Sequence, residues 1–230
     1  YVATYLTLGS LYLDFSPRNR PVSGYLRELD LNRGEARVSF QSNGVRYSRE
    51  VFVSYPDQVL VIRLKASKPG GISFSTRFDN PMIHQVGPTG PDGVVMTGIA
   101  PSYVAHRPYE ATQIAYDSAR SMRYAVALQA MHRDGHIRAD STGLTVDQAT
   151  EVTLLVATAT SFKDFRTRPA ASGIRPGQAA EMALVAAPRY PADSLVARHR
   201  HDYSKLFDAV SLDLGRDRST GLPTDERRKR

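Results

Sequence analysis

The sequence predicts a mainly β protein, a two-sheet antiparallel β-sandwich followed by a short helical linker. The first observation is alternation: residues such as Ile72, Phe74 and Phe78 place apolar side chains at every second position, as in a strand with one buried face. The second is the turn sequences between such segments, of which Asn43-Gly44 and Asp134-Gly135 are the strongest hairpin signals because these residues tolerate positive φ. Helical periods occur only near the end of the chain, which favours a sheet packed on a sheet.

The first half of the chain predicts strands in close succession. The first is expected within Leu6–Phe15, where the apolar parity switches at Gly9-Ser10 and a β-bulge would reset the two faces. Five further strands with tight turns then form an antiparallel meander. Among them, Val59–Leu64 is nearly continuous apolar sequence and is expected to be buried on both faces. The five strands are expected at residues 25–31, 36–40, 45–53, 59–64 and 72–78.

The second half contains one long segment without periodicity. After a short strand at Val94–Thr97, the segment Ile99–Ser121 has no clean period and contains two prolines. A structureless segment of this length in a compact domain is usually functional or mobile. Alternation then returns from Met122, and Val152–Ala157 is a second buried apolar run.

Two helices are expected after the strands. Gln178–Ala187 is rich in alanine and is ended by Pro188. A second helix at 194–207 begins with Asp193 or Ser194 as its N-cap. It has an apolar stripe at helical spacing, made of Leu195, His199, Tyr203, Leu206 and Phe207.

Beyond this helix, the alternation of Val210, Leu212 and Leu214 predicts a short strand. Leu222–Glu226 is typical of a further helix start, with Thr224 as N-cap and acidic residues near the positive end of the helix dipole.

Composition excludes some classes of protein. The chain has 230 residues, 41% of them hydrophobic, and no cysteine, which is enough for a real core and excludes disulfides and thiolate metal sites. No apolar run approaches membrane-spanning length, and no signal peptide follows Tyr1. Because a natural start would carry Met, we expect the front end to be truncated or processed.

The net charge of +7 and the pI of about 9.7 raise the possibility of nucleic-acid binding. The last five residues, 226–230, supply +3 of this charge, and the other basic residues are scattered. Few of them lie beside aromatic residues, as a nucleic-acid groove would require, so we expect no nucleic-acid partner.

No metal site or common catalytic motif is expected. The chain has no Walker loop, no dinucleotide-binding glycine motif and no nucleophile elbow. His199 and His201 are two positions apart on a helix and do not share a face, so we expect His199 to be packed and His201 solvated. Paired carboxylates would indicate a glycosidase, but nothing in the sequence pairs any two of Asp14, Asp30, Glu50, Asp57, Asp79 and Glu110.

Several segments together resemble a known family. The clearest resemblance is in two segments near the end of the chain, HRHDYSKLFDAVSLDLG (residues 199–215) and LPTDER (residues 222–227). Together they resemble the linker of bacterial glycoside hydrolase family 95, the α-L-fucosidase family. TLGSLYLDF, Thr7 to Phe15, resembles the family's PLGDLYLDF strand, with Ser10 where Asp is usual. YLRELDLNRGEARVSF, VRYSREVFVSYPDQVLVIRL and TLLVATATSF also resemble its front domain, so that the resemblance runs from about Tyr5 to Glu226.

The resemblance implies a division of the chain into three parts. Residues 1–177 correspond to the β-sandwich, 178–226 to a helical linker toward an α/α toroid catalytic domain, and 227–230 to a basic tail. The family hydrolyses α-fucosyl linkages with inversion and needs no metal or organic cofactor. Its catalytic Glu, Asn and Asp all lie in the toroid, so no catalytic residue is carried over. Family members are often exported, which implies a periplasmic or secreted location.

One segment is a candidate for contact with substrate. The family has a similar A-P-S-x-V segment at Ala100–Val104, and the residues that follow concentrate aromatic and donor side chains. Aromatic faces and Arg or His donors suit the C–H faces and hydroxyls of sugars. The candidate substrate-binding residues are Tyr103, His106, Arg107 and Tyr109; an ordered surface loop without function is the alternative.

The expected partners are the catalytic toroid of the same protein and, in the complete enzyme, a fucosylated oligosaccharide, with no membrane partner. Two other functions remain open. The chain could be the front domain of another enzyme, such as a family 65-like disaccharide phosphorylase, or a free-standing carbohydrate-binding sandwich.

Overall fold

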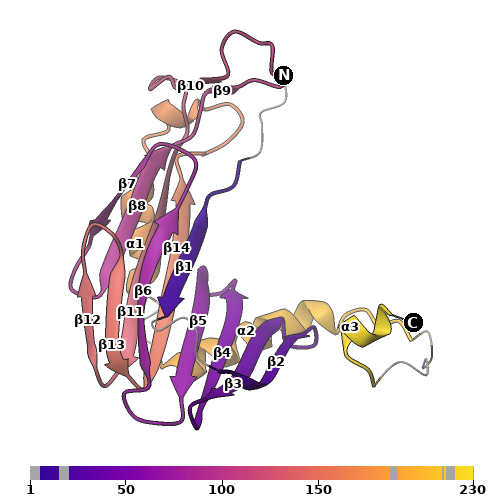
Figure 1. Cartoon of the computed structure of the whole chain (residues 1–230). Helices are drawn as coiled ribbons and strands as arrows, with labels where there is room; N and C mark the ends of the chain where they lie inside the picture. The colour runs from indigo at the N-terminus through magenta and orange to yellow at the C-terminus, as the bar shows by residue number, and fades with distance from the viewer. Residues whose placement is uncertain (1–5, 16–20, 187–190, 214, 216–220, 230) are drawn as a thin grey trace.

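The structure, a computed structural model, describes residues 6–15, 21–186, 191–213, 215 and 221–229. Two antiparallel sheets pack face to face and helices follow them in the sequence (Figure 1), so the predicted fold class is confirmed. The larger sheet has the spatial order β2 (Ser23–Asp30), β3 (Glu35–Ser42), β4 (Val45–Ser54), β5 (Val59–Ala66), β14 (Glu151–Thr160), β11 (Arg123–Arg133), β8 (Gly93–Ile99) and β7 (His84–Pro88). The smaller sheet has the order β1 (Ser10–Phe15), β6 (Ile72–Asp79), β13 (Leu144–Ala149) and β12 (His136–Ala139).

The remaining elements are short. β9 (Tyr103–Val104) and β10 (Ile114–Ala115) pair with each other within the segment that lacks periodicity, and η1 (Pro169–Ala171) is a single 3₁₀ turn. The helices are α1 (Pro176–Ala186), α2 (Ala192–Phe207) and α3 (Thr224–Arg227). The two longer helices match the expected ones at 178–187 and 194–207, apart from residue 187, which lies outside the described residues.

The Asn43-Gly44 turn is confirmed. Asn43 and Gly44 have φ of 50° and 74°, and Ser42 pairs with Val45 across the two-residue loop. Positive φ at both turn positions matches the twist of the flanking strands, which fixes the register of β3 against β4.

The predicted five-strand meander is wrong in its last strand. β2 to β5 are consecutive neighbours in the larger sheet, but β6 belongs to the smaller sheet, where it pairs with β1. Gly70, with φ of 67°, and Gly71 lie in the turn that takes the chain from one sheet to the other. Alternation in the sequence cannot distinguish these two paths, because β6 has one buried face in either sheet.

Asp134-Gly135 also joins different sheets rather than forming the predicted hairpin. Both residues have positive φ, 60° and 72°, so the turn itself is confirmed. However, β11 pairs with β14 and β8, whereas β12 pairs with β13 in the other sheet. Both edges of β11 are already occupied, so the following strand has no free edge there to pair with.

Two further predictions fail near the ends of elements. The change of parity at Gly9 marks the start of β1 and not a bulge. Gly9 has φ of 117°, and a Cβ atom there would lie 2.6 Å from the backbone oxygen of Asp79, so the position requires glycine. The predicted strand at 210–214 is not formed by residues 210–213, and Leu214 lies outside the described residues. Val210 and Leu212 are exposed and pair with no strand of the described sheets.

The main core fills the space between the sheets. It is formed by inward-facing residues of β5, β14, β11 and β8 against those of β6 and β13, including Leu64, Leu128, Leu154, Phe74 and Val146. The apolar runs of β5 and β14 are buried on both faces, as predicted, because helices cover the opposite face.

The outer face of the larger sheet is covered by α1 and α2. Ala180 and Leu184 of α1, with Leu195 and Val196 of α2, pack on the sheet residues Phe52, Val59, Val61, Ala125, Ala127, Leu155 and Ala157. The predicted stripe on α2 is therefore half correct: Leu195 and His199 are buried, but Leu206 is 78% exposed.

The helix starts differ from the predicted caps. α2 begins after Pro191, whose side chain cannot cap, and α3 begins after Pro223. Proline suits the extended backbone that precedes a helix. Asp193 consequently lies within the first turn of α2, where its carboxylate pairs with Arg63 of β5.

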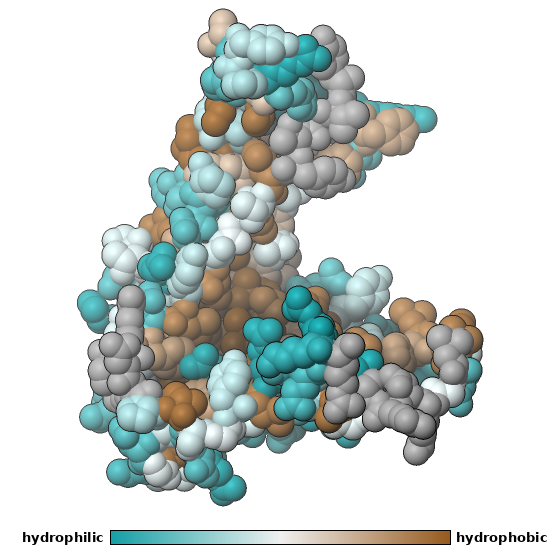
Figure 2. Space-filling view, turned by 45° about the vertical axis from the view of Figure 1, so that its right-hand side comes forward, coloured by the Kyte–Doolittle hydropathy of each residue, from teal (hydrophilic) through white to brown (hydrophobic). Residues whose placement is uncertain are grey.

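The smaller sheet leaves part of the larger one uncovered. Several inward-facing residues of β2, β3 and β4 are exposed, with Leu29 and Val53 at 65% and 66%, and most of the others on β3 and β4 are half-buried. Figure 2 shows the resulting hollow, which is lined with hydrophobic residues. It lies between the two-sheet part of the molecule and the projecting part that β2–β4, α2 and α3 form in Figure 1. We call these inward-facing residues of β2–β4 the open inner face.

Candidate functional site

The sequence-predicted residues lie in a loop at one end of the sandwich. Tyr103 is on β9, and His106, Arg107 and Tyr109 are in the connection to β10, far from α3 in Figure 1. All four side chains are exposed. None of them lines the pocket described below.

Three of the four residues belong to one hydrogen-bonded group. The Tyr103 hydroxyl donates to the Glu110 carboxylate, which also accepts from the backbone N–H of Arg107 at 3.1 Å. The Arg107 guanidinium donates to the Tyr109 hydroxyl and lies 5.7 Å from that ring. His106 forms no hydrogen bond with the described residues. Glu110, one of the six carboxylates considered for a glycosidase pair, thus connects the two sides of the loop through its hydrogen bonds.

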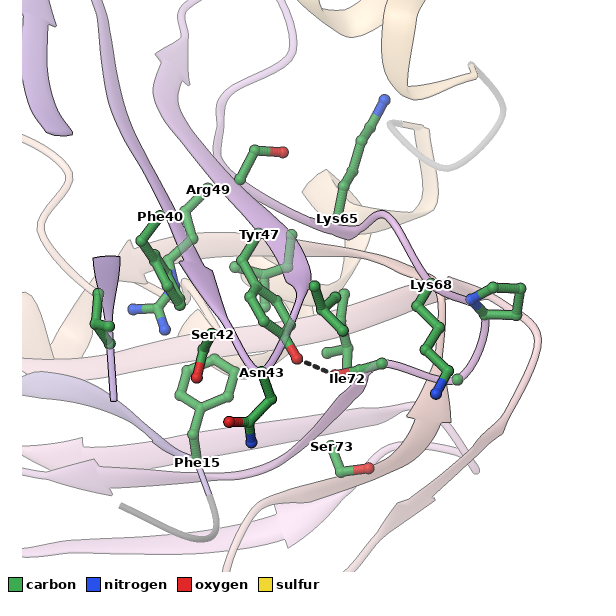
Figure 3. Close-up of a pocket in the computed structure, with 17 residues that line it drawn as sticks. Phe15, Phe40, Ser42, Asn43, Tyr47, Arg49, Lys65, Lys68, Ile72 and Ser73 are labelled. Carbon is green, nitrogen blue, oxygen red and sulfur yellow. Dashed lines mark hydrogen bonds between the residues drawn. The ribbon is translucent and has the colours of Figure 1, made fainter. Parts of the chain in front are cut away.

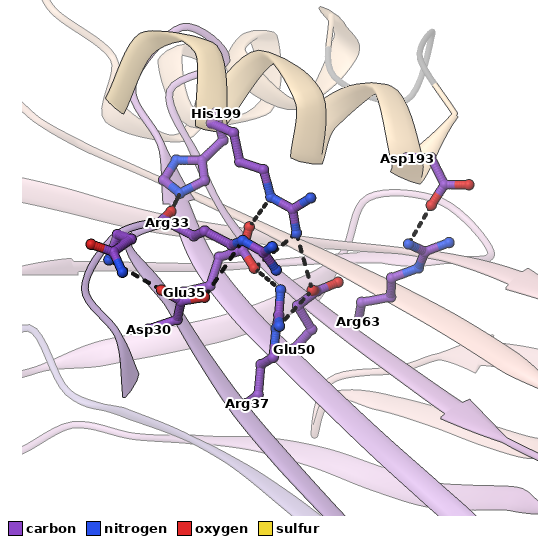
Figure 4. Close-up of polar contacts among 10 residues, drawn as sticks. Asp30, Arg33, Glu35, Arg37, Glu50, Arg63, Asp193 and His199 are labelled. Carbon is purple, nitrogen blue, oxygen red and sulfur yellow. Dashed lines mark hydrogen bonds and ion pairs between the residues drawn. The ribbon is translucent and has the colours of Figure 1, made fainter. Parts of the chain in front are cut away.

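The most tightly organised polar group instead attaches α2 to the sheet. Glu35 of β3 is fully buried and accepts hydrogen bonds from Arg200 of α2 and from Arg37 of its own strand (Figure 4). Glu50 lies 3.4 Å from Arg37 and 4.0 Å from Arg200, so it completes a group of two acids and two arginines. The sequence predictions missed Glu35, because its helix partner lies 165 residues away.

The electrostatics of Glu35 favour its charged form. Burial raises the pKa of this carboxyl, but the hydrogen bonds and positive charges of Arg200 and Arg37 outweigh burial and leave the pKa below its usual value. Such an arrangement is a structural ion cluster, because each acid is paired with a guanidinium that cannot release a proton.

Further contacts fix α2 along its length. Arg63 of β5 pairs with Asp193 at 2.5 Å and Glu151 at 2.7 Å, and Arg198 pairs with Asp57 at 3.0 Å. His199 is packed, as predicted: its ring stacks on Phe52 with 4.8 Å between centroids. His199 Nε2 donates to a backbone oxygen at 2.9 Å, so this nitrogen carries the proton.

A pocket of about 520 Å³ opens on the open inner face (Figure 3). Three aromatic rings, Phe15, Phe40 and Tyr47, contribute to its lining, and Tyr47 donates to the backbone oxygen of Gly71 at 3.3 Å. Arg49 lies 4.4 Å and 5.4 Å from the centroids of the two phenylalanine rings. This volume and mixture of aromatic and polar groups are typical of small-molecule sites.

Within the part of the chain that the structure describes, no group of three or more His, Asp or Glu side chains could hold a metal ion. No helix formed by the described residues is long and apolar enough to cross a membrane.

Comparison with known proteins places the chain among front domains of carbohydrate-active enzymes. Residues 1–165 match the family described as glycosyl hydrolase family 65, N-terminal domain. Alpha-L-fucosidase 2 from Arabidopsis thaliana is 33% identical over 219 residues, which cover 91% of this chain and 26% of that protein. A putative kojibiose phosphorylase from the human microbiome has a TM-score of 0.44 at 10% identity, over 80% of this chain and 25% of that one.

The chain therefore spans about a quarter of the length of each of these relatives. The family match covers the β-sandwich, and the similarity to the fucosidase extends over nearly the whole chain. The chain belongs to the glycosyl hydrolase family 65 N-terminal domains and is related to the front domains of α-L-fucosidases of family 95.

Proposed function

We propose that the chain is the non-catalytic front domain and linker of an α-L-fucosidase-like glycoside hydrolase. The observation that supports this best is the 33% identity with alpha-L-fucosidase 2 over 91% of the chain. In this proposal the longer polypeptide hydrolyses α-fucosyl linkages with inversion, and the acid and base lie in a helical toroid that follows α3.

The structure offers this role a rigid base. α2 is attached to the sheet by the Glu35 cluster, by Asp193 and by Arg198, so the direction in which the chain leaves the sandwich is well defined. In Figure 1 the β9–β10 loop and α3 project from the same side of the molecule, with the hollow of Figure 2 between them. A domain that follows α3 and lies across the mouth of this hollow would contact both the loop and α3 and leave the open inner face accessible.

The β9–β10 loop is proposed to reach the rim of the sugar pocket in that assembly. Tyr103 and Tyr109 would present aromatic faces, and His106 and Arg107 would present donors, so that the loop binds substrate and transfers no proton. The hydrogen bonds through Glu110 order the loop beforehand, which lowers the entropy cost of binding.

The test compares two proteins on 4-nitrophenyl α-L-fucoside. The purified 230-residue chain is expected to release no nitrophenol above a mock preparation, and the longer polypeptide is expected to release it. Cleavage by the short chain alone would contradict the assignment of this chain as non-catalytic.

One observation favours a second candidate. The matching family carries the description of family 65, and a disaccharide phosphorylase is the runner-up for the longer protein. Strict dependence of glycoside cleavage on inorganic phosphate would identify the phosphorylase, since a hydrolase uses water instead.

A further inference from the structure

The pocket on the open inner face contains a buried polar atom without a partner. Ser42 is 95% buried, since its exposed fraction is 5%. Its Oγ forms no hydrogen bond and is the one such buried side-chain atom found among the described residues. A buried hydroxyl without a partner is costly. Ser42 lines the pocket, but its Oγ is itself closed to solvent, so a ligand supplies the missing partner only when the side chain rotates toward the pocket.

A cation without an acid lies in the same pocket. Arg49 extends from β4 between the rings of Phe15 and Phe40, and no ion pair joins it to a described acidic residue. Burial lowers the pKa of its guanidinium. The rings attract the cation but cannot accept hydrogen bonds in the plane of the guanidinium, and no described residue accepts one from it. A carboxylate is the acceptor that fits such a planar fork.

The other lining residues do not neutralise this charge. The described residues that line the pocket include Arg49, Lys65 and Lys68 but no aspartate or glutamate. Lys65 is paired with Glu151 at 3.5 Å. Figure 3 shows the side chains of Ser42, Asn43 and Arg49 pointing toward the Phe15 side of the pocket, with Lys68 at the opposite edge.

From this geometry we propose that the pocket binds a sugar that carries a carboxylate, a uronic acid residue of a glycan. The carboxylate pairs with Arg49, and one C–H face of the sugar ring lies on the aromatic side chains. Asn43 bonds a ring hydroxyl, and Ser42 bonds another once its side chain rotates toward the pocket. A volume of about 520 Å³ is ample for a single sugar ring.

This inference rests on the proposed function for the choice of a sugar and makes it more specific: the glycan recognised by the longer protein contains an acidic residue beside its fucose. A neutral sugar would leave Arg49 unpaired and a simple organic anion would leave the aromatic walls unused. The two halves of the site therefore demand both features in one ligand.

The test is a titration of the ¹⁵N-labelled 230-residue chain, followed by NMR, with D-galacturonate and D-glucuronate. At least one uronate is expected to shift the amide signals of residues 40–49 in a saturable way. D-galactose, D-glucose and sodium acetate, each with one half of the recognised chemistry, are expected to bind at least tenfold more weakly.

Two arginine variants on the same strand separate the site from general charge. Arg49→Gln is expected to weaken uronate binding about 10- to 100-fold, the effect of losing hydrogen bonds between charged groups. Arg46→Gln, on the opposite face of β4, should leave the affinity unchanged, and unchanged spectra of both variants without ligand verify their folds.

Three results would overturn the proposal: no saturable shift with either uronate, equal affinity for a neutral sugar or acetate, or equal affinities of the two variants. The nitrophenyl fucoside assay contains no uronate. The proposed function and the uronate site can therefore fail independently of each other.

Discussion

Replacement of Glu35 by glutamine tests how α2 is attached to the sheet. The substitution keeps the size of the side chain and one acceptor oxygen but removes its charge. Arg200 of α2 and Arg37 of β3 then lose the carboxylate that both of them contact. The contact between helix and sheet is weakened without a cavity being formed.

The expected cost follows from burial. Removing one partner of a buried ion pair destabilises a protein by about 3–5 kcal/mol. Glu35 is fully buried, but the side chains of Arg200 and Arg37 are 39% and 30% exposed, so both can regain water. We therefore expect the lower end, about 3 kcal/mol, which is a large part of the ~5–15 kcal/mol stability of a typical domain.

The assay is urea denaturation of the 230-residue chain followed by circular dichroism. The matched control is Glu181→Gln, the same substitution at an exposed position of α1. Hydrogen exchange should show loss of protection in α2 before the sheet. A loss below about 1 kcal/mol, the value for exposed pairs, or a loss equal to that of Glu181→Gln, would show that Glu35 does not attach α2 to the sheet through a buried ion pair.

Acid should reveal the same carboxylate. The pKa of Glu35 is lowered in the folded state from an ordinary value of 4.5. Its contribution to stability is thus present above pH 4.5 and is lost as the pH falls toward the native pKa. The difference in stability between the wild type and Glu35→Gln should therefore shrink in acid.

Three further predictions follow from other parts of the structure. Burial, with a smaller effect of the nearby Tyr116, raises the pKa of Tyr124 from 10.0 to about 12. Ultraviolet titration should show one tyrosine that ionises near pH 12, and the free energy of unfolding should fall as the pH rises above 10.0. A normal titration of all tyrosines would contradict this prediction. Gly34→Ala should destabilise the chain by at least about 1 kcal/mol, since φ is +62° and the new Cβ would lie 2.9 Å from the Tyr203 ring; an unchanged urea midpoint would show that this contact relaxes freely. In the longer polypeptide, Tyr103→Ala and His106→Ala should lower kcat/KM roughly tenfold to a few hundredfold with little change in Tm; wild-type kcat/KM in both variants would leave the loop as ordinary surface.

Local sequence patterns predicted the elements better than their partners. Alternation located the strands, and Asn43-Gly44 fixed one register, because both depend on neighbouring residues. Asp134-Gly135 predicted its turn but not the change of sheet, which depends on the occupied edges of β11. Val210 and Leu212 alternate as strand residues do, yet a strand also requires an edge to pair with.

The polar sites were harder to predict. Glu35 occupies a strand position that alternation would assign to solvent, and only folding brings Arg200 to it. One usable signal was the close spacing of Glu35 and Arg37 on β3. The pocket likewise combines Phe15 of one sheet with Phe40 and Arg49 of the other, so no local motif could reveal it. The loop residues were predicted to contact substrate because no helical or strand periodicity explained their residue types, and this stays a prediction.

¹H NMR of the longer polypeptide acting on 4-nitrophenyl α-L-fucoside, with and without inorganic phosphate, distinguishes an inverting fucosidase from a phosphorylase. Fucose is expected to be released at the same rate in both solutions and to appear first as the β anomer, because water attacks the face opposite the leaving group. Formation of fucose 1-phosphate, first appearance of the α anomer, or no release of fucose would contradict it.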